Sequence, residues 1–189
     1  MHPTVAAAHA LITAIAPADA LEATHRADTL HWLTTTDDVY RRIKPATPPR
    51  HLVSYVVPVA PADGAVLLVD HVNAGLWLPP GGHVDPGEHP GEHPADTAER
   101  EAAEEFGLTV TATSPLFLTV TRTVGLDSGH TDVSLWFPVP VLRSLPITPP
   151  EHGEFRSVRW WSRAELAAAD PALFDPHLHR FTAKLAAGA

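Results

Sequence analysis

Three glutamates stand close together in the stretch Arg100-Glu-Ala-Ala-Glu-Glu-Phe-Gly-Leu108. On a helix, Glu101, Glu104 and Glu105 occupy positions i, i+3 and i+4, so their carboxylates share one face within about 6 Å of one another. Like charges at that spacing repel by roughly 0.2–0.5 kcal/mol per pair, and a bound cation relieves the repulsion. Oxygen ligands without a thiolate favour hard ions, first Mg²⁺ and then Mn²⁺. Arg100 lies four residues before Glu104 and can hold that carboxylate in one rotamer.

A solvated acidic face is the alternative interpretation of this helix, and its surroundings weigh against it. The preceding segment, Leu78-Pro-Pro-Gly-Gly82, contains two glycines, which let the backbone approach a ligand closely. The opposite side of the helix is small and apolar, at Ala102, Ala103 and Phe106. We therefore expect the helix to pack on that side and to turn its acids toward a site.

These residues resemble the Nudix box of the Nudix hydrolases. That pattern is Gly, five residues, Glu, seven residues, Arg-Glu, a hydrophobic residue, any residue, Glu-Glu, any residue, Gly and a hydrophobic residue. Gly82 and the run 100–108 match it, and Trp77-Leu-Pro-Pro-Gly-Gly82 and Glu154-Phe-Arg-Ser-Val-Arg-Trp-Trp161 are also similar to the family. The resemblance covers roughly residues 50–165. It implies an α/β fold, a Nudix-like α/β/α sandwich with a mixed sheet.

One part of the box departs from the family pattern. Residues 87–90 and 91–94 both read Gly-Glu-His-Pro, a duplication that lengthens the loop by four residues. Glu88 has the family spacing from Gly82, whereas Glu92 has the family spacing to Arg100. Both remain candidates for the single Glu of the box, with a slight preference for Glu92 because its distance to the helix is unchanged.

The resemblance implies a Mg²⁺-dependent hydrolase that cleaves a pyrophosphate linkage in a nucleoside diphosphate joined to another moiety. Mg²⁺, or Mn²⁺ in its place, neutralises the phosphates and lowers the pKa of a bound water. The implied metal ligands are Glu101, Glu104, Glu105 and the Gly82 carbonyl. The implied catalytic residues are Glu104, Glu105, Arg100, Glu92 and Glu88. The general base stays unassigned, and a catalytically silent nucleotide sensor with the same fold is the second hypothesis.

Several residues outside the box are weaker candidates. Arg122 can meet a substrate phosphate, Trp77 can stack on a base, and Glu154, with Glu151, can add a ligand or base. A structural hydrogen bond from Glu154 to Arg156 or Arg159 is the alternative.

Histidines near the box allow two further hypotheses. His83, His89 and His93 can bind Zn²⁺, but their spacing fits no helix face, and an exposed proline-rich loop is the favoured explanation. His130 and Asp132 open a predicted strand and can touch substrate.

The remaining pattern predicts the elements that position these residues. Residues 4–43 have apolar positions at helical spacing, and the proline-rich stretch 44–50 marks a boundary. We expect a helical extension over 1–48, which can mediate a homodimer, and a catalytic domain over 49–189. Strands are expected at 51–59, 65–69, 76–79, 116–124, 132–142 and 155–161, and helices at 94–106, after Ser162 and at 173–185.

Composition limits the partners. The 189 residues carry a formal net charge of −9, which weighs against nucleic-acid polymers and membrane surfaces. A small nucleotide-like substrate is the partner that the resemblance implies. Eight acidic residues and one arginine lie between Asp85 and Glu105, so most of this charge belongs to one loop and one helix. The absence of cysteine excludes thiolate zinc sites and disulfides. An N-terminus without a basic segment predicts no signal peptide and a cytoplasmic location, and the scarcity of lysine beside arginine, alanine and proline is typical of a bacterial protein.

Overall fold

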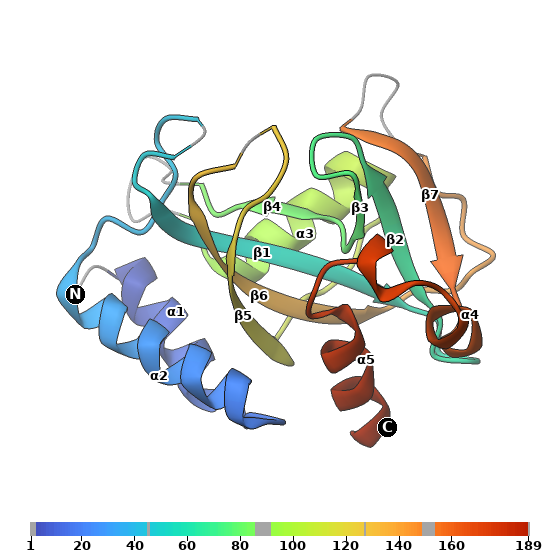
Figure 1. Ribbon diagram of the computed structural model, residues 1–189, viewed down its shortest axis with the longest axis horizontal. Helices are drawn as coiled ribbons and strands as arrows, with labels where there is room; N and C mark the ends of the chain where they lie inside the picture. Colours follow the sequence, from blue (N-terminus) through green and yellow to red (C-terminus); the bar gives the residue numbers. More distant parts are fainter. Residues whose placement is uncertain (1–2, 45, 86–91, 127, 149–153, 189) are drawn as a thin grey trace.

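The computed structural model describes residues 3–44, 46–85, 92–126, 128–148 and 154–188. A seven-stranded mixed sheet forms its centre (Figure 1). The strands are β1 (Arg50–Val59), β2 (Val66–His71), β3 (Leu76–Leu78), β4 (Gly81–His83), β5 (Phe117–Arg122), β6 (Thr131–Pro140) and β7 (Phe155–Trp161). The predicted α/β class with a mixed sheet is confirmed.

The parallel pair of β1 and β6 is the axis of the sheet. The main path runs β3-β2-β1-β6-β5, with β4 paired to β1 and β7 paired to β2. β1 and β6 are parallel over ten residue pairs, and every other strand pair is antiparallel. Because β1 lies at the centre, its neighbours bring residues from distant parts of the sequence to one end of the sheet.

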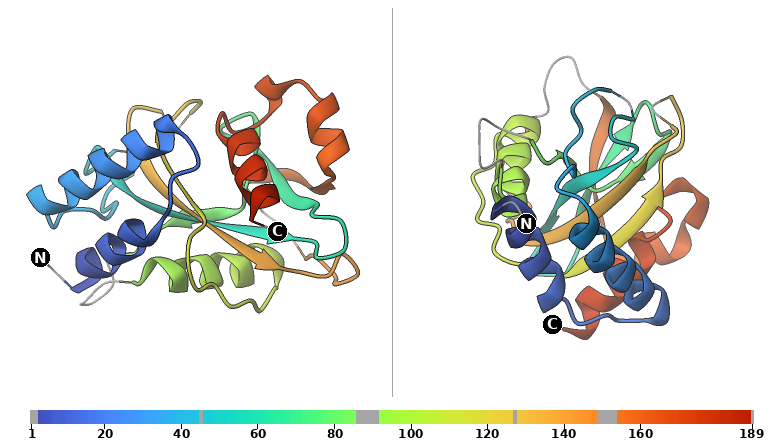
Figure 2. Two further views of the ribbon diagram at one scale, coloured as in Figure 1. Left: turned by 90° about the horizontal axis from the view of Figure 1, so that it is seen from below. Right: turned by 90° about the vertical axis from the view of Figure 1, so that its left-hand side faces the viewer.

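Helices cover both faces of this sheet (Figure 2). They are α1 (Pro3–Ala14), α2 (Ala20–Thr35), α3 (Pro94–Phe106), α4 (Arg163–Ala168) and α5 (Leu178–Ala187), with a 3₁₀ turn at Pro171–Leu173. One apolar cluster lies beneath α1 and α3, and a second lies between the sheet and the C-terminal helices, with Trp136, Phe174 and Phe181 at its centre. Among the described residues, no helix is long and apolar enough to cross a membrane.

Local sequence explains why α3 begins and ends where predicted. Pro94 occupies its first turn, the His93 side chain accepts a hydrogen bond from the Ala95 amide, and Gly107 ends the helix with φ of 66°. Ala98, Ala102 and Phe106 are fully buried, whereas Ala103, which was expected on the same apolar side, is exposed. The helix therefore packs against β1 and β4 and leaves its glutamates on another side.

The N-terminal helices pack on the sheet of their own chain. Glu22 of α2, which is fully buried, accepts hydrogen bonds from the amides of Ala18 and Leu118 and pairs with Lys184 of α5 at 2.7 Å. His25 accepts a hydrogen bond from the Val120 amide through Nδ1. These contacts tie α2 both to β5 and to α5.

The apolar side of these helices, including Val5, Ala8 and Ile12, is buried within the same core cluster as β1 and β6. The predicted homodimer through these helices therefore has no support in the structure. The division of the chain into 1–48 and 49–189 stays a prediction.

Three details differ from the sequence analysis. α2 ends at Thr35, although helix was expected to residue 43, because Thr36 is extended and its hydroxyl accepts a hydrogen bond from the Asp38 amide. The last helix starts at Leu178, since residues 171–177 form a 3₁₀ turn and an irregular segment. Strand β4 was not predicted, because Gly81-Gly82-His83 lacks the β-branched pattern of a strand and is held by pairing with β1.

Replacement of Lys184 by methionine tests the buried ion pair. The substitution leaves the Glu22 carboxylate buried with two amide donors and no cation, so the free energy of unfolding should fall by about 2–4 kcal/mol. The exposed pair between Arg42 and Asp38 provides the matched control, and Arg42→Met should cost about 0–1 kcal/mol. Equal losses in urea unfolding would contradict a special role of Glu22.

Candidate active site

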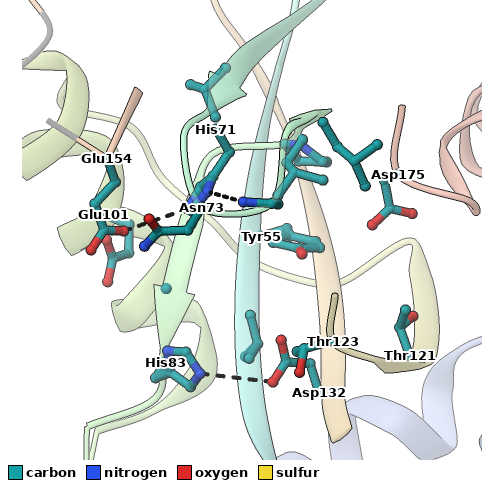
Figure 3. A pocket seen from close by; sticks show the side chains of 18 of the residues that line it. Tyr55, His71, Asn73, His83, Glu101, Thr121, Thr123, Asp132, Glu154 and Asp175 are labelled. Carbon is teal, nitrogen blue, oxygen red and sulfur yellow. Dashed lines mark hydrogen bonds and ion pairs between the residues drawn. The ribbon is translucent and has the colours of Figure 1, made fainter. Parts of the chain in front are cut away.

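A cavity of about 1010 Å³ opens beside the acidic face of α3. Figure 3 shows Glu101 and Glu154 on one wall, Asp175 on the opposite wall, and His83 with Asp132 at one end. Arg41 and Lys44, which precede β1, also line the cavity, as does Arg122 at the end of β5. The cavity thus joins an acidic wall to three basic side chains.

Gly81 and Gly82 lie in close contact with neighbouring groups. A side chain at Gly81, whose φ is 148°, would place its Cβ 2.3 Å from the Ser54 carbonyl oxygen. At Gly82 a Cβ would lie 2.1 Å from Oε1 of Glu101. The Gly81 amide donates a hydrogen bond to Glu105 at 3.2 Å. Two glutamates of α3 therefore lie directly against the backbone of β4.

Arg100 connects the members of the acidic group. Its guanidinium forms a bidentate pair with Glu92, through Nε and Nη2 at 2.9 and 3.1 Å, and donates to Glu101 at 2.8 Å and Glu104 at 3.1 Å. Nη2 also approaches the carbonyl oxygen of His83 at 3.4 Å. These carboxylates hold the pKa of Arg100 above its usual value, with the hydrogen bond to Glu92 as the main cause.

The structure places Glu92, one of the two candidates from the duplicated loop, within this network. It also accepts a hydrogen bond from the Thr97 hydroxyl at 2.7 Å. Burial raises the pKa of Glu92, but the hydrogen bonds from Arg100 and Thr97 outweigh burial, so the pKa lies below its usual value. Glu88 and His89 lie outside the described residues.

Burial distinguishes the three glutamates of the predicted metal set. Glu101 is 12% exposed at its side chain, whereas Glu104 is 60% exposed. Burial raises the pKa of Glu101, and burial together with the neighbouring Glu101 charge raises the pKa of Glu105 to about 9. Crowded carboxylate oxygens in a partly desolvated position form a donor set that fits a hard divalent cation.

Glu154 has a different partner from the two arginines considered in the sequence analysis. Its carboxylate faces Nε2 of His71 at 3.6 Å, and this contact lowers the pKa of Glu154. Arg156 instead pairs with Asp70, and Arg159 pairs with Glu165. Glu154 lines the cavity beside the acidic wall, and Glu151 lies outside the described residues.

Arg122 and Trp77, the two other residues predicted to contact substrate, lie in different surroundings. Arg122 is exposed at the cavity and forms no ion pair within the part of the chain that the structure describes. Trp77 is not among the residues that line the cavity. Its ring packs edge-on against Trp161, 5.3 Å away, beneath the C-terminal segment.

Sequence reasoning missed Asp175, which lines the cavity and is only 5% exposed. Its carboxylate accepts a hydrogen bond from the His177 amide at 2.7 Å, and burial raises its pKa to about 6. A buried acid with a raised pKa in a cavity is typical of functional sites. The segment Phe174-Asp175-Pro176 carries no pattern that indicates this position, because only the fold brings it across from α3.

The histidine hypotheses are partly corrected by the structure. His83 was explained as part of an exposed loop, and this is wrong, because it belongs to β4 and pairs with Val53 of β1. His93 is the N-cap of α3 and does not join His83. His130 and Asp132 line the cavity near His83.

Comparison with known proteins points to one family. The family model described as NUDIX domain matches residues 49–185. A crystal structure titled as a hydrolase of the NUDIX family from Clostridium perfringens is similar, with 25% identity, a TM-score of 0.57, and coverage of 74% of this chain and 99% of that chain. Among curated proteins, none matches the chain.

Two other solved structures share the fold. The E. coli dihydroneopterin triphosphate pyrophosphohydrolase has 19% identity and a TM-score of 0.58, covering 80% of this chain and 99% of its own. The NUDIX domain of Shewanella oneidensis NrtR, complexed with ADP ribose, has 18% identity and a TM-score of 0.52, covering 82% and 94%. The predicted α/β/α sandwich is therefore confirmed.

Replacement of Gly82 by alanine tests the close contact with Glu101. The added methyl group should displace the Glu101 carboxylate and lower the free energy of unfolding by about 1–3 kcal/mol. Gly188→Ala is the control, because the nearest atom to its Cβ is 3.9 Å away. Urea unfolding measures both, and a Gly82→Ala protein as stable as the control would contradict the packing described.

Replacement of Asp175 by asparagine tests the buried acid. Because its pKa rises from 3.8 to about 6 on folding, its contribution to stability is fully present below about pH 4 and is lost as pH rises through about 6. Asp175→Asn keeps an acceptor for the His177 amide, so it should raise the free energy of unfolding at pH 8 by about 2–3 kcal/mol.

The decline in stability between about pH 4 and 6 should also be shallower in Asp175→Asn, and the part that remains belongs to Glu101 and Glu105, whose pKa values are raised as well. Asp38→Asn, at an exposed ion pair, serves as the control and should retain that decline. An unchanged profile in Asp175→Asn would mean that this carboxyl titrates normally.

Proposed function

Because the chain belongs to the Nudix family, we propose that it is a hydrolase that uses Mg²⁺ to cleave a pyrophosphate linkage in a nucleotide-like molecule. The observation that carries this proposal is the position of Glu101 and Glu105. Both lie against the Gly81-Gly82 backbone at the wall of a large cavity. Mn²⁺ satisfies the same oxygen ligands.

In this proposal the acidic residues have two roles, which are to bind the cation and to position Arg100. Glu101, Glu104 and Glu105 hold the cation, together with the Gly82 carbonyl. Bound there, Mg²⁺ supplies charge neutralisation for the phosphates and acidifies a coordinated water. Glu92 acts through Arg100, which its bidentate pair holds in place, and Arg100 in turn orients Glu101 and Glu104.

The cavity supports a substrate of nucleotide size. Its volume of about 1010 Å³ is at the upper end of the range of roughly 300–1,000 Å³ found for small-molecule sites. Arg41, Lys44 and Arg122 also line the cavity and supply positive charge for phosphates. ADP ribose and dihydroneopterin triphosphate, which the names of two structural neighbours contain, are molecules of this chemical class.

A panel of substrates tests the proposal directly. The protein with Mg²⁺ should release phosphate-containing products from at least one of dNTPs, ADP-ribose, NADH or dinucleoside polyphosphates. Glu104→Gln combined with Glu105→Gln should lower kcat by at least about 100-fold, because the cation loses two ligands. Asp96→Asn, at an exposed acid of the same helix, should leave kcat within about twofold.

Two outcomes would contradict the proposal. Activity that survives the double substitution would place the chemistry elsewhere. Tight binding of a nucleotide by the unmodified protein, with no product over hours, would instead identify the second hypothesis, a catalytically silent sensor.

A further inference from the structure

Four potential metal ligands converge at the end of the β1/β6 pair, outside the acidic face of α3. They are His51 on β1, His83 on β4, and His130 and Asp132 at the start of β6. Strand register brings them together, because His51 lies opposite Asp132 in the parallel pair and His83 lies opposite Val53. His83 occupies a variable position of the Nudix box, directly after Gly82, and the other three residues lie outside the box.

The ligand atoms of the four residues all point inward. Oδ1 of Asp132 lies 3.2 Å from Nε2 of His51, 3.2 Å from Nε2 of His130 and 3.8 Å from Nε2 of His83. All four ligand atoms lie within 4.8 Å of one another. Atoms about 2.0 Å from a tetrahedral ion are about 3.3 Å apart, so small side-chain rotations close this group around one ion.

Hydrogen bonds on the far side of two rings suit metal binding. Nδ1 of His51 lies 2.9 Å from the Pro48 carbonyl oxygen, which only accepts, so Nδ1 carries the proton. The Thr123 hydroxyl lies 3.3 Å from Nδ1 of His130 and 3.1 Å from the His130 carbonyl oxygen, so it accepts from Nδ1 when its own proton points to that carbonyl. With Nδ1 protonated, each neutral ring presents an Nε2 lone pair to the centre of the group. This arrangement is typical of metal-binding histidines, whose second nitrogen donates to a carbonyl or hydroxyl oxygen.

When the imidazoles are neutral, the same arrangement is costly without a cation. The two imidazole lone pairs and the carboxylate oxygen that they face repel one another. The side chains of His51 and His130 are 0% and 2% exposed, so water does not relieve this repulsion. Nε2 of His51, Nε2 of His83 and Oδ1 of Asp132 are buried and form no hydrogen bond of good geometry within the described chain. A positive charge at the centre satisfies all of these atoms at once.

We propose that His51, His83, His130 and Asp132 bind one divalent transition-metal ion of the Zn²⁺ class. Three imidazoles and one carboxylate suit Zn²⁺ and similar ions, whereas Mg²⁺ prefers oxygen ligands alone. His83, His130 and Asp132 line the cavity, which provides the route of entry. The site is therefore chemically distinct from the glutamate site and does not depend on the proposed hydrolysis.

The position of the ion gives it a structural role next to the glutamate site. His83 directly follows Gly82, and its carbonyl oxygen contacts Arg100. An ion that joins His83 to β1 and β6 fixes the end of β4, and with it the backbone against which Glu101 and Glu105 pack. Zn²⁺ should therefore stabilise the fold even when the glutamates hold no ion.

Calorimetric titration of the chelator-treated full chain with Zn²⁺, in excess Mg²⁺ to occupy the glutamates, tests the site. One Zn²⁺ should bind per chain, and the unfolding temperature should rise with Zn²⁺ concentration. Glu104→Gln with Glu105→Gln should retain this binding. His83→Asn and Asp132→Asn should each weaken it by more than the roughly 10–100-fold that loss of an outer hydrogen bond costs.

Two measurements keep the test decisive if one variant folds poorly. His31→Asn, at an exposed histidine of α2, is the control for adventitious binding and should bind Zn²⁺ like the unmodified protein. X-ray absorption at the zinc edge should show imidazole scattering with nearest atoms at about 2.0–2.1 Å.

The proposal fails if no stoichiometric Zn²⁺ binding occurs in excess Mg²⁺, or if His83→Asn and Asp132→Asn both bind normally. A zinc spectrum without imidazole scattering would also overturn it.

Discussion

The contact between the glutamates of α3 and the backbone of Gly81 and Gly82 is the constraint on which the site depends. No side chain fits at Gly81, which faces the backbone of β1, and a side chain at Gly82 would displace the Glu101 carboxylate. This contact fixes how closely α3 approaches β4, the short strand against which it packs. The cavity wall, the placement of Arg100 and the crowding of the carboxylates all follow from it.

The carboxylates that crowd at this contact repel one another, and Arg100 offsets that repulsion. Arg100 contacts Glu92, Glu101 and Glu104 at once, so the network keeps its shape even though Glu101 and Glu105 are half-buried. Natural proteins retain such unfavourable groups where a site needs them. The excess of acidic residues in the sequence is thus concentrated where a cation can bind.

The sequence predicts the local parts of this structure better than the assembled parts. The limits of α3 follow from Pro94 and Gly107, and the capping box of α4 follows from Ser162 and Glu165, because these signals act over a few residues. Asp175 and the group around His51 could not be predicted in the same way. They depend on strand register and on the path of the C-terminal segment, and neither of these produces a periodic pattern in the amino-acid sequence. Strand β4 was missed for the same reason, since pairing with β1 determines its structure.

The contacts of α2 with β5 have a consequence for solubility. β5 is the last strand of the sheet path, and the register places the Leu118 and Val120 amides on its open side, where Glu22 and His25 accept their hydrogen bonds. An open strand edge with free amides is a template for pairing with other chains. The N-terminal helices therefore act as a cover for the edge, and a shortened protein without them would expose a strand able to aggregate.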